Sequence, residues 1–202
     1  MTLRRELPDV PGLRRLGAPF WEAFVSALEG VADADGVAAL CSHESGFVAS
    51  ATNPKGKATG LIQFMPATAR LLGTSTDALR EMTEAEQLPY VRAFFVRVGR
   101  GRFIERRDVP VAAGWPAYIG RPDSFVAARI GEIAYDWNAP LDLDKDGAIT
   151  LGELRAKVLG RLARVGRLTW TEEQGRPPSS GWPWLAAGAA GLVAWWLWER
   201  QP

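Results

Sequence analysis

Apolar residues recur at helical spacing along most of this chain, and the strict alternation typical of half-buried strands is scarce. The first such segment, residues 20–29, carries its apolar residues on one helical face before Gly30 stops it. These residues are Trp21, Phe24, Val25 and Leu28. The pattern predicts a mainly α-helical body without internal repeats, with a loop-rich stretch over residues 99–121.

A second helix is predicted just downstream, because the same spacing returns there. Its apolar stripe ends in a carboxylate and consists of Val37, Leu40, Cys41 and Glu44. Asp33 or Asp35 can cap the start of this helix, and Gly46 lies just beyond its end. Glu44 is therefore expected on the apolar face, in the last helical turn.

Capping signals predict further helices in the rest of the body. Thr83 and Glu86 form a T-x-x-E capping box for a helix in which Pro89 can introduce a bend. Asp123 can cap a helix over residues 125–137. A last amphipathic helix is expected, with Leu151, Leu154, Val158 and Leu162 on its apolar face and Arg155, Lys157, Arg161 and Arg164 on its basic face.

Charge and composition limit the classes of partner and cofactor. The 202 residues include 24 Lys and Arg against 23 Asp and Glu, so we expect no nucleic-acid partner held by global charge. The arginines within residues 92–107 are expected to form a solvated face, with a polyanion patch as the alternative. With 47% hydrophobic residues, one ordinary globular core is possible, and a single Cys and a single His disfavour a disulfide or a typical zinc site.

The two ends of the chain differ in character. Residues 1–18 form a basic arm without the continuous apolar stretch of a secretory signal, so we expect no N-terminal signal peptide. Residues 171–182 resemble a linker, and residues 183–199 are expected to form a hydrophobic tail helix. The residues from Trp184 to Trp198 would rise about 22 Å, which is short for a hydrocarbon core of about 30 Å. Tryptophans at both ends favour a membrane, and packing on the core or in an oligomer interface is the alternative.

Glu44 has reasons to be protonated near neutral pH. It continues an apolar stripe, and it lies in the last turn of its helix, where the helix dipole disfavours a negative charge. Gly46 allows another chain to approach closely. A protonated carboxyl group is what cleavage of a glycosidic bond requires, because the leaving oxygen must receive a proton. The alternative is a helix-end glutamate that pairs with an arginine.

A family resemblance supports the catalytic reading of Glu44. The stretch ESGF at residues 44–47 is followed by Asn53-Pro54, by Ala58 and by GLIQFMPATA at residues 60–69. In residue type and spacing, these stretches resemble the catalytic region of lytic transglycosylases with a goose-type lysozyme fold. A weaker similarity extends over residues 32–158, in the manner of muralytic domains of phage tails and virions. The resemblance implies a mainly α, lysozyme-like catalytic domain over residues 19–140.

The resemblance implies a role for each matching residue. Glu44 would be the lone catalytic acid and then base at the bond between N-acetylmuramic acid and N-acetylglucosamine, with no cofactor for catalysis. The product would be a 1,6-anhydro sugar, or a plain reducing end if the enzyme is a muramidase. Ser45 would position Glu44 or the sugar, and Gln63 would bond an acetamido or hydroxyl group. The expected groove walls are Phe64, Met65 and Tyr118, with core packing as the alternative for each.

The third motif of the family, often Ala-Tyr-Asn, is only approximated here. The chain offers Ala134-Tyr135-Asp136-Trp137-Asn138, in which the tyrosine and the asparagine are three residues apart. Tyr135 is retained as a candidate substrate residue, and Asn138 is a weaker candidate. His43 is expected to be structural.

Residues 142–153 match the twelve-residue EF-hand loop and predict a calcium site. The expected ligands are Asp142, Asp144, Asp146, the Ala148 carbonyl, Thr150 and Glu153, with Gly147 at the sharp turn. The alternative is an Asp- and Gly-rich turn. Because no second hand pairs with it, we expect a structural Ca²⁺ site, within an EF-hand-like unit over residues 141–170.

Together these features predict a peptidoglycan-degrading enzyme that acts on murein glycan strands in the bacterial cell wall or periplasm. We expect it to be virion- or membrane-associated, with the tail contacting lipid or other virion proteins. The basic residues before the tail would keep the body on the cytoplasmic side, or inside a virion membrane. The rival is a non-catalytic, calcium-binding structural or wall-binding component of a virion.

Overall fold

The computed structural model describes residues 5–54, 57–160, 162 and 167–170. The predicted linker over residues 171–182 and the predicted tail helix over residues 183–199 lie outside these residues. In the part of the chain that the structure describes, no helix combines the length and the apolar character needed to cross a membrane.

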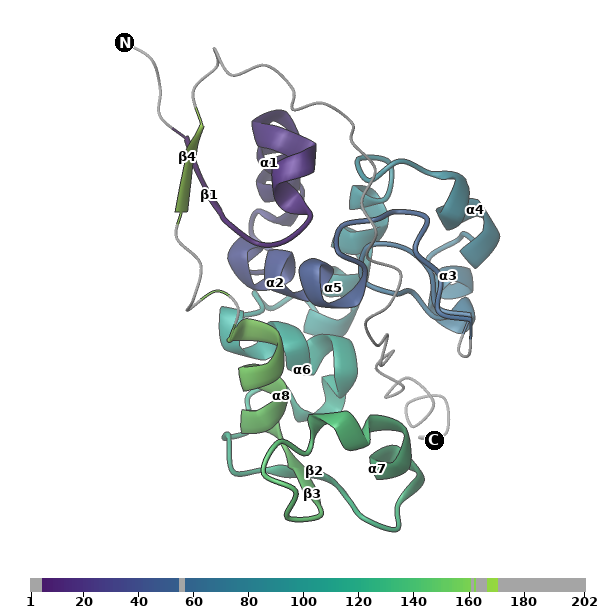
Figure 1. The fold of residues 1–202 in the computed structure, drawn as a ribbon. Helices are drawn as coiled ribbons and strands as arrows, with labels where there is room; N and C mark the ends of the chain where they lie inside the picture. The colour runs from purple at the N-terminus through teal and green to yellow at the C-terminus, as the bar shows by residue number, and fades with distance from the viewer. Residues whose placement is uncertain (1–4, 55–56, 161, 163–166, 171–202) are drawn as a thin grey trace.

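The described chain is mainly helical, as its apolar spacing predicts (Figure 1). The α-helices are α1 (Leu13–Leu28), α2 (Ala34–Glu44), α3 (Pro66–Leu71), α4 (Thr76–Glu81), α5 (Leu88–Gly99), α6 (Val109–Gly114), α7 (Ile133–Asn138) and α8 (Leu151–Leu159). Short 3-10 turns are η1 (Arg106–Asp108), η2 (Pro116–Tyr118) and η3 (Ala139–Leu141). Two antiparallel pairs join β1 (Arg5–Pro8) to β4 (Arg167–Trp170) and β2 (Val126–Arg129) to β3 (Ala148–Thr150).

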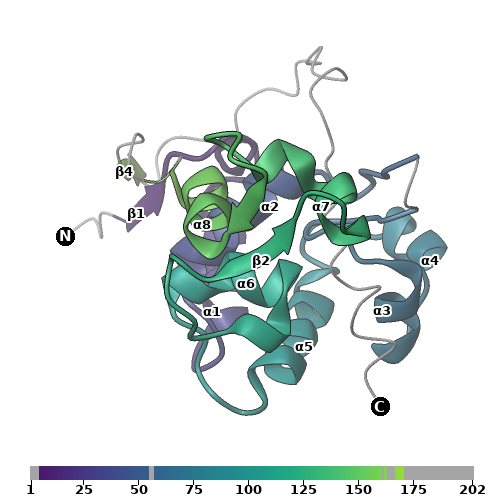
Figure 2. The ribbon, with the colours of Figure 1, turned by 90° about the horizontal axis from the view of Figure 1, so that it is seen from below.

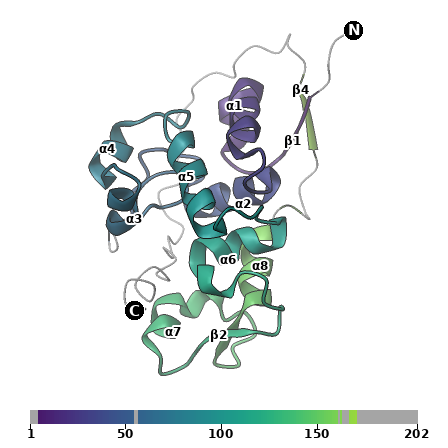
Figure 3. The same ribbon diagram turned by 180° about the vertical axis from the view of Figure 1, so that it is seen from behind.

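Helix α2 lies at the centre of the fold and contacts α1, α6 and α8 (Figures 2 and 3). Asp33 caps it, since the Asp33 side chain accepts a hydrogen bond of 2.8 Å from the Gly36 amide. Every residue of α2 from Gly36 to Ser42 is buried. The core therefore surrounds the helix that carries Glu44 at its end.

Helix α1 begins at Leu13, inside the segment expected to be an N-terminal arm. It bends at Gly17, whose φ of 74° is open to glycine but costly for other residues. Leu13 and Phe20, on either side of this bend, are both buried. Burial on both sides of the bend explains why the helix extends beyond the stripe seen in residues 20–29.

Helix α5 begins at Leu88 rather than at the capping box of Thr83 and Glu86. The two residues do bond each other: the Thr83 amide donates to Glu86 Oε2 at 2.7 Å, and the Glu86 amide donates to Thr83 Oγ1 at 3.3 Å. Pro89 lies in the first turn of α5. Because proline has no amide hydrogen, it starts this helix and does not bend it.

The prediction of a helix over residues 125–137 is wrong. Residues Val126–Arg129 form strand β2, which pairs with β3. Strand β3 belongs to the predicted calcium loop of residues 142–153, called the acidic loop below, and α7 begins only at Ile133. Gly131, with φ of +91°, separates the two elements. The pairing partner is distant in sequence, so local periodicity could not predict the strand. Figure 1 shows β2, β3 and α7 together at the end of the molecule opposite α1.

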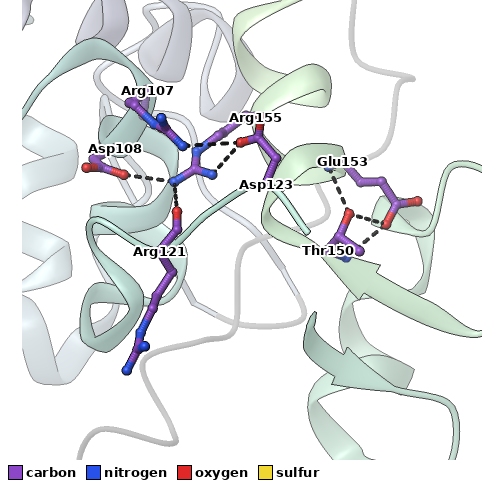
Figure 4. Close-up of polar contacts among 7 residues, drawn as sticks. All are labelled: Arg107, Asp108, Arg121, Asp123, Thr150, Glu153 and Arg155. Carbon is purple, nitrogen blue, oxygen red and sulfur yellow. Dashed lines mark hydrogen bonds and ion pairs between the residues drawn. The ribbon is translucent and has the colours of Figure 1, made fainter. Parts of the chain in front are cut away.

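The prediction that Arg155 lies on an exposed basic face is also wrong. Arg155 in α8 is 7% exposed and bonds acidic side chains and carbonyl groups (Figure 4). Its guanidinium donates to Asp108 Oδ1 at 2.9 Å and to Asp123 Oδ1 at 2.5 Å. It also donates to the carbonyl oxygens of Arg107 at 2.9 Å and Arg121 at 3.0 Å. Asp123 thus bonds α8 and does not cap the predicted helix.

Candidate active site

The end of α2 is held in place by close backbone contacts. Gly46 and Phe47 both have positive φ, 60° and 61°, which turns the chain sharply after Glu44. Gly12 packs against this turn so closely that a Cβ there would lie 2.0 Å from the Gly46 carbonyl oxygen. Arg15 of α1 donates to the Phe47 carbonyl at 2.7 Å and to Glu84 Oε1 at 2.9 Å. The segment before α2 therefore packs against the turn that follows Glu44.

A small pocket opens beside the carboxyl group of Glu44. It is lined by Glu44, Ile62, Gln63, Phe64, Met65, Thr68, Phe94 and Ala113. The structure thus brings together four of the predicted site residues: Glu44, Gln63, Phe64 and Met65. Ile62 and Thr68 lie in the GLIQFMPATA stretch, and the sequence analysis missed Phe94 and Ala113 because they come from α5 and α6, far along the chain.

The carboxyl group of Glu44 has a buried oxygen atom, although the residue as a whole is only partly buried. Oε1 is closed off from solvent and has no hydrogen-bond partner among the described residues. Burial raises the pKa of Glu44 to about 8, because a charged carboxylate would lose its hydration. The direction of this shift agrees with the expectation from the sequence, with burial as its cause, and it favours the protonated acid at neutral pH.

Burial also shifts the pKa of the neighbouring Cys41. Burial and the nearby Glu44 raise the pKa of its thiol, so Cys41 stays neutral. Its side chain is fully buried in α2 and belongs to the core.

The loop that carries Gln63 runs beside the end of α2 and is rigidly braced. Ser45 Oγ lies 2.9 Å from the Leu61 carbonyl and 3.1 Å from the Cys41 carbonyl, so it can tie the loop to the helix end. Gln63 has φ of 54°, and its Nε2 donates to the carbonyls of Ala51 and Gly60, both at 3.1 Å. Both amide hydrogens of Gln63 are already bonded to backbone carbonyls. Gln63 can therefore bind a ligand only as an acceptor, through Oε1.

A buried glutamine, Gln87, holds the same loop from behind. Its Oε1 accepts a bond of 2.9 Å from the Leu61 amide, and its Nε2 donates to the carbonyls of Ala49 at 2.8 Å and Leu79 at 2.7 Å. Gly60 passes so close that a Cβ there would lie 2.5 Å from Gln87 Oε1. The sequence signals no such role for Gln87, since its partners are backbone groups from three separate segments.

The two predicted tyrosines are not among the residues that line this pocket. Tyr118 packs its ring against Phe125 with 4.7 Å between centroids. Tyr135 donates its hydroxyl to Asp142 Oδ2 at 2.6 Å, a bond that raises the pKa of Tyr135 to about 12. Asn138 is buried and donates to the Ala134 carbonyl at 2.9 Å. Tyr135 thus joins the acidic loop.

The acidic loop brings together a second cluster of polar side chains. Carboxylate oxygens of Asp142, Asp144 and Asp146 all lie within 4.8 Å of one another. Thr150 and Glu153 form the capping box of α8, in which the Thr150 hydroxyl donates to Glu153 Oε2 at 2.9 Å (Figure 4). Ala148 begins β3, and its amide donates to Asp146 Oδ1 at 2.8 Å.

Comparison with known families shows what part of this chain is similar to. Residues 26–87 match the Transglycosylase SLT domain. The match covers less than half of the chain and includes α2, the Gln63 loop and Gln87. A search of curated proteins found no match. The SLT domain indicates a lytic transglycosylase, an enzyme that cleaves peptidoglycan, and the sequence prediction of such an enzyme is confirmed at this level.

Proposed function

We propose that Glu44 is the general acid and then the general base of a lytic transglycosylase that cleaves the β-1,4 bond between N-acetylmuramic acid and N-acetylglucosamine. The observation that carries this proposal is the buried Oε1 of Glu44, which has no partner among the described residues and lies in a pocket whose lining, apart from Phe94 and Ala113, falls within the SLT match. A carboxyl group that lacks hydration and partners holds its proton at neutral pH. It can then donate that proton to the leaving sugar oxygen.

The reaction proceeds in two proton transfers. Glu44 first protonates the bridging oxygen while its bond to C1 of N-acetylmuramic acid breaks, so that N-acetylglucosamine leaves with a 4-hydroxyl group. The acetamido group of the substrate supports the positive charge at C1. Ionised Glu44 then removes the proton of the C6 hydroxyl as that oxygen bonds C1. The product is a 1,6-anhydro sugar, and Glu44 regains its proton.

A lone carboxyl group suits this route better than plain hydrolysis by a carboxylate pair. Glu44 is the single acidic residue among the described residues that line the pocket. Both common hydrolytic mechanisms use a second carboxylate on the other side of the sugar. An internal nucleophile from the substrate needs none, which favours the anhydro product over a muramidase reaction.

The walls of the pocket supply substrate contacts of two kinds. Oε1 of Gln63 is an acceptor for a hydroxyl or acetamido hydrogen, because its amide hydrogens are already bonded. Met65 is partly exposed and offers apolar surface. Phe64 is only 2% exposed and packs in the core, edge-on to Phe94 at 6.4 Å between centroids, so it supports the pocket wall from behind. Ser45 positions the loop, since its hydroxyl lies within bonding distance of the Leu61 carbonyl.

Digestion of murein by the full-length chain tests this proposal. We expect Glu44→Gln to lower the rate at least about 1000-fold, because amide nitrogen cannot donate an acidic proton. The control Glu105→Gln removes an exposed carboxylate elsewhere and should keep full activity. Mass spectrometry of the wild-type product should find 1,6-anhydro ends. Reducing ends alone would favour a muramidase, and equal product from wild type and Glu44→Gln would favour the non-catalytic wall-binding alternative.

We further propose that the chain is membrane- or virion-associated. Residues 181–198 contain no charged residue and include five of the nine tryptophans of the chain, which favours contact with lipid or with other virion proteins. Flotation of the full-length chain with liposomes tests the lipid contact, and a chain that stays at the bottom of the gradient would argue against it.

A further inference from the structure

Asp142 carries a buried carboxylate oxygen that has no partner. The residue is 8% exposed, and its Oδ2 accepts bonds from the Tyr135 hydroxyl at 2.6 Å and from the Gly147 amide at 3.1 Å. Its Oδ1 is closed off from solvent and has no hydrogen-bond partner among the described residues. A buried acceptor without a donor or an ion is costly, so this atom requires a partner.

The surroundings of Asp142 indicate that this partner is a cation. Asp144 and Asp146, both exposed, place carboxylate oxygens within 4.8 Å of that of Asp142. Among the salt bridges of the described residues, none neutralises these three aspartates. Three negative charges at such distances repel one another unless a positive charge lies between them.

We propose that the loop over residues 142–153 binds one Ca²⁺ ion, independently of the glycan pocket. One oxygen each from Asp142, Asp144 and Asp146 would hold the ion, together with the Ala148 carbonyl. Ca²⁺ fits better than Mg²⁺ because it accepts several carboxylates in an irregular shell, whereas Mg²⁺ demands a near-octahedral one. Exposed Asp144 and Asp146 leave room for water to complete the coordination.

Glu153 is not among the three carboxylates that converge, but its side chain contacts the same loop. Its Oε1 accepts bonds from the amides of Leu143 at 2.6 Å and Asp144 at 3.4 Å, so the side chain reaches back across the loop. A carboxylate oxygen can accept a hydrogen bond and also bind an ion. Thr150, which the loop pattern predicts as a ligand, uses its hydroxyl in the capping box with Glu153.

The ion would stabilise the helix that follows the loop. Glu153 lies in the first turn of α8, two residues before Arg155. Helix α8 contacts both α2 and α6, and Arg155 bonds Asp108 at the start of α6 (Figure 4). An ordered loop therefore secures α8 against the helix that carries Glu44. We therefore expect Ca²⁺ to raise the thermal stability of the whole domain.

Thermal unfolding of the full-length chain, followed by circular dichroism with CaCl₂ or with EGTA, tests the proposal. At about a hundredfold excess over Kd, Ca²⁺ should raise the Tm of the wild type by about 5–10 °C. The double variant Asp144→Asn/Asp146→Asn should lose this rise. The control Glu81→Gln/Glu105→Gln, which also removes two exposed carboxylates, should keep it. Isothermal titration with CaCl₂ should give one site in the wild type.

The outcomes separate the calcium site from the proposed catalysis, because neither measurement depends on activity. In EGTA, the Asp144/Asp146 variant should unfold at the Tm of the wild type or above it, since it loses charge repulsion. An equal rise of Tm with MgCl₂ would overturn the choice of Ca²⁺. No rise in the wild type, or an equal rise in the Asp144/Asp146 variant, would overturn the site.

Discussion

At the scale of single residues, Glu44 links the chemistry of the pocket to the stability of the fold. Its pKa is raised from 4.5 to about 8 by burial, so the folded chain holds a proton that the unfolded chain releases above pH 4.5. Native protein binds more protons between these two values, and stability therefore falls as the pH rises through this window. Above pH 8 the full cost of the buried charge is present.

Removal of the charge should therefore stabilise the chain under alkaline conditions. Glu44→Gln should match the wild type near pH 4 and exceed it at pH 9 by about 2–5 kcal/mol in the free energy of unfolding. Urea denaturation of both chains at the two pH values measures this difference. If the free energy of unfolding changed with pH equally in the wild type and the variant, Glu44 would not be the buried acid described above.

At the scale of elements, Arg155 holds α8 to the segment that begins α6. Its side chain and that of Asp108 are 8% and 11% exposed, so removal of the guanidinium leaves a buried carboxylate without a partner. Arg155→Met should lower the free energy of unfolding by about 3–5 kcal/mol. Arg107→Met is the control, because Arg107 is an exposed arginine that bonds Asp123 at 3.5 Å, and it should cost less than about 1 kcal/mol. Equal losses in urea denaturation would contradict a special role for Arg155.

The elements also mark where sequence reasoning succeeds and where it stops. The start and end of α2 follow from the Asp33 cap, the apolar spacing and Gly46, all of which are local. Strand β2 and the burial of Arg155 depend on partners distant in sequence, namely β3 and Asp108. The pocket shows the same division: helical spacing puts Glu44 at the end of its apolar stripe, the family resemblance identifies the Gln63 loop, and Ala113 reaches the pocket only through packing.

At the scale of the whole molecule, the end of α2 that carries Glu44 packs against residues that lie outside the SLT match at residues 26–87. Gly12→Ala should destabilise the protein strongly, because its Cβ would lie 2.0 Å from the Gly46 carbonyl oxygen. Gly73→Ala is a matched control, since Gly73 also has positive φ but no heavy atom within 4 Å of an added Cβ. We expect a loss of about 1–2 kcal/mol for Gly73→Ala, from backbone strain alone, and a larger loss for Gly12→Ala. Thermal unfolding of the two variants checks the order.

The contact between Gly12 and Gly46 matters for the design of a shorter fragment of this protein. A fragment cut at the family boundary would keep the acid and its glutamine loop but lose the Arg15 bond to the Phe47 carbonyl. The turn after Glu44 would then be free to relax, and water could reach the carboxyl group. Such a fragment would keep the sequence motif but lose the burial that raises the pKa of Glu44.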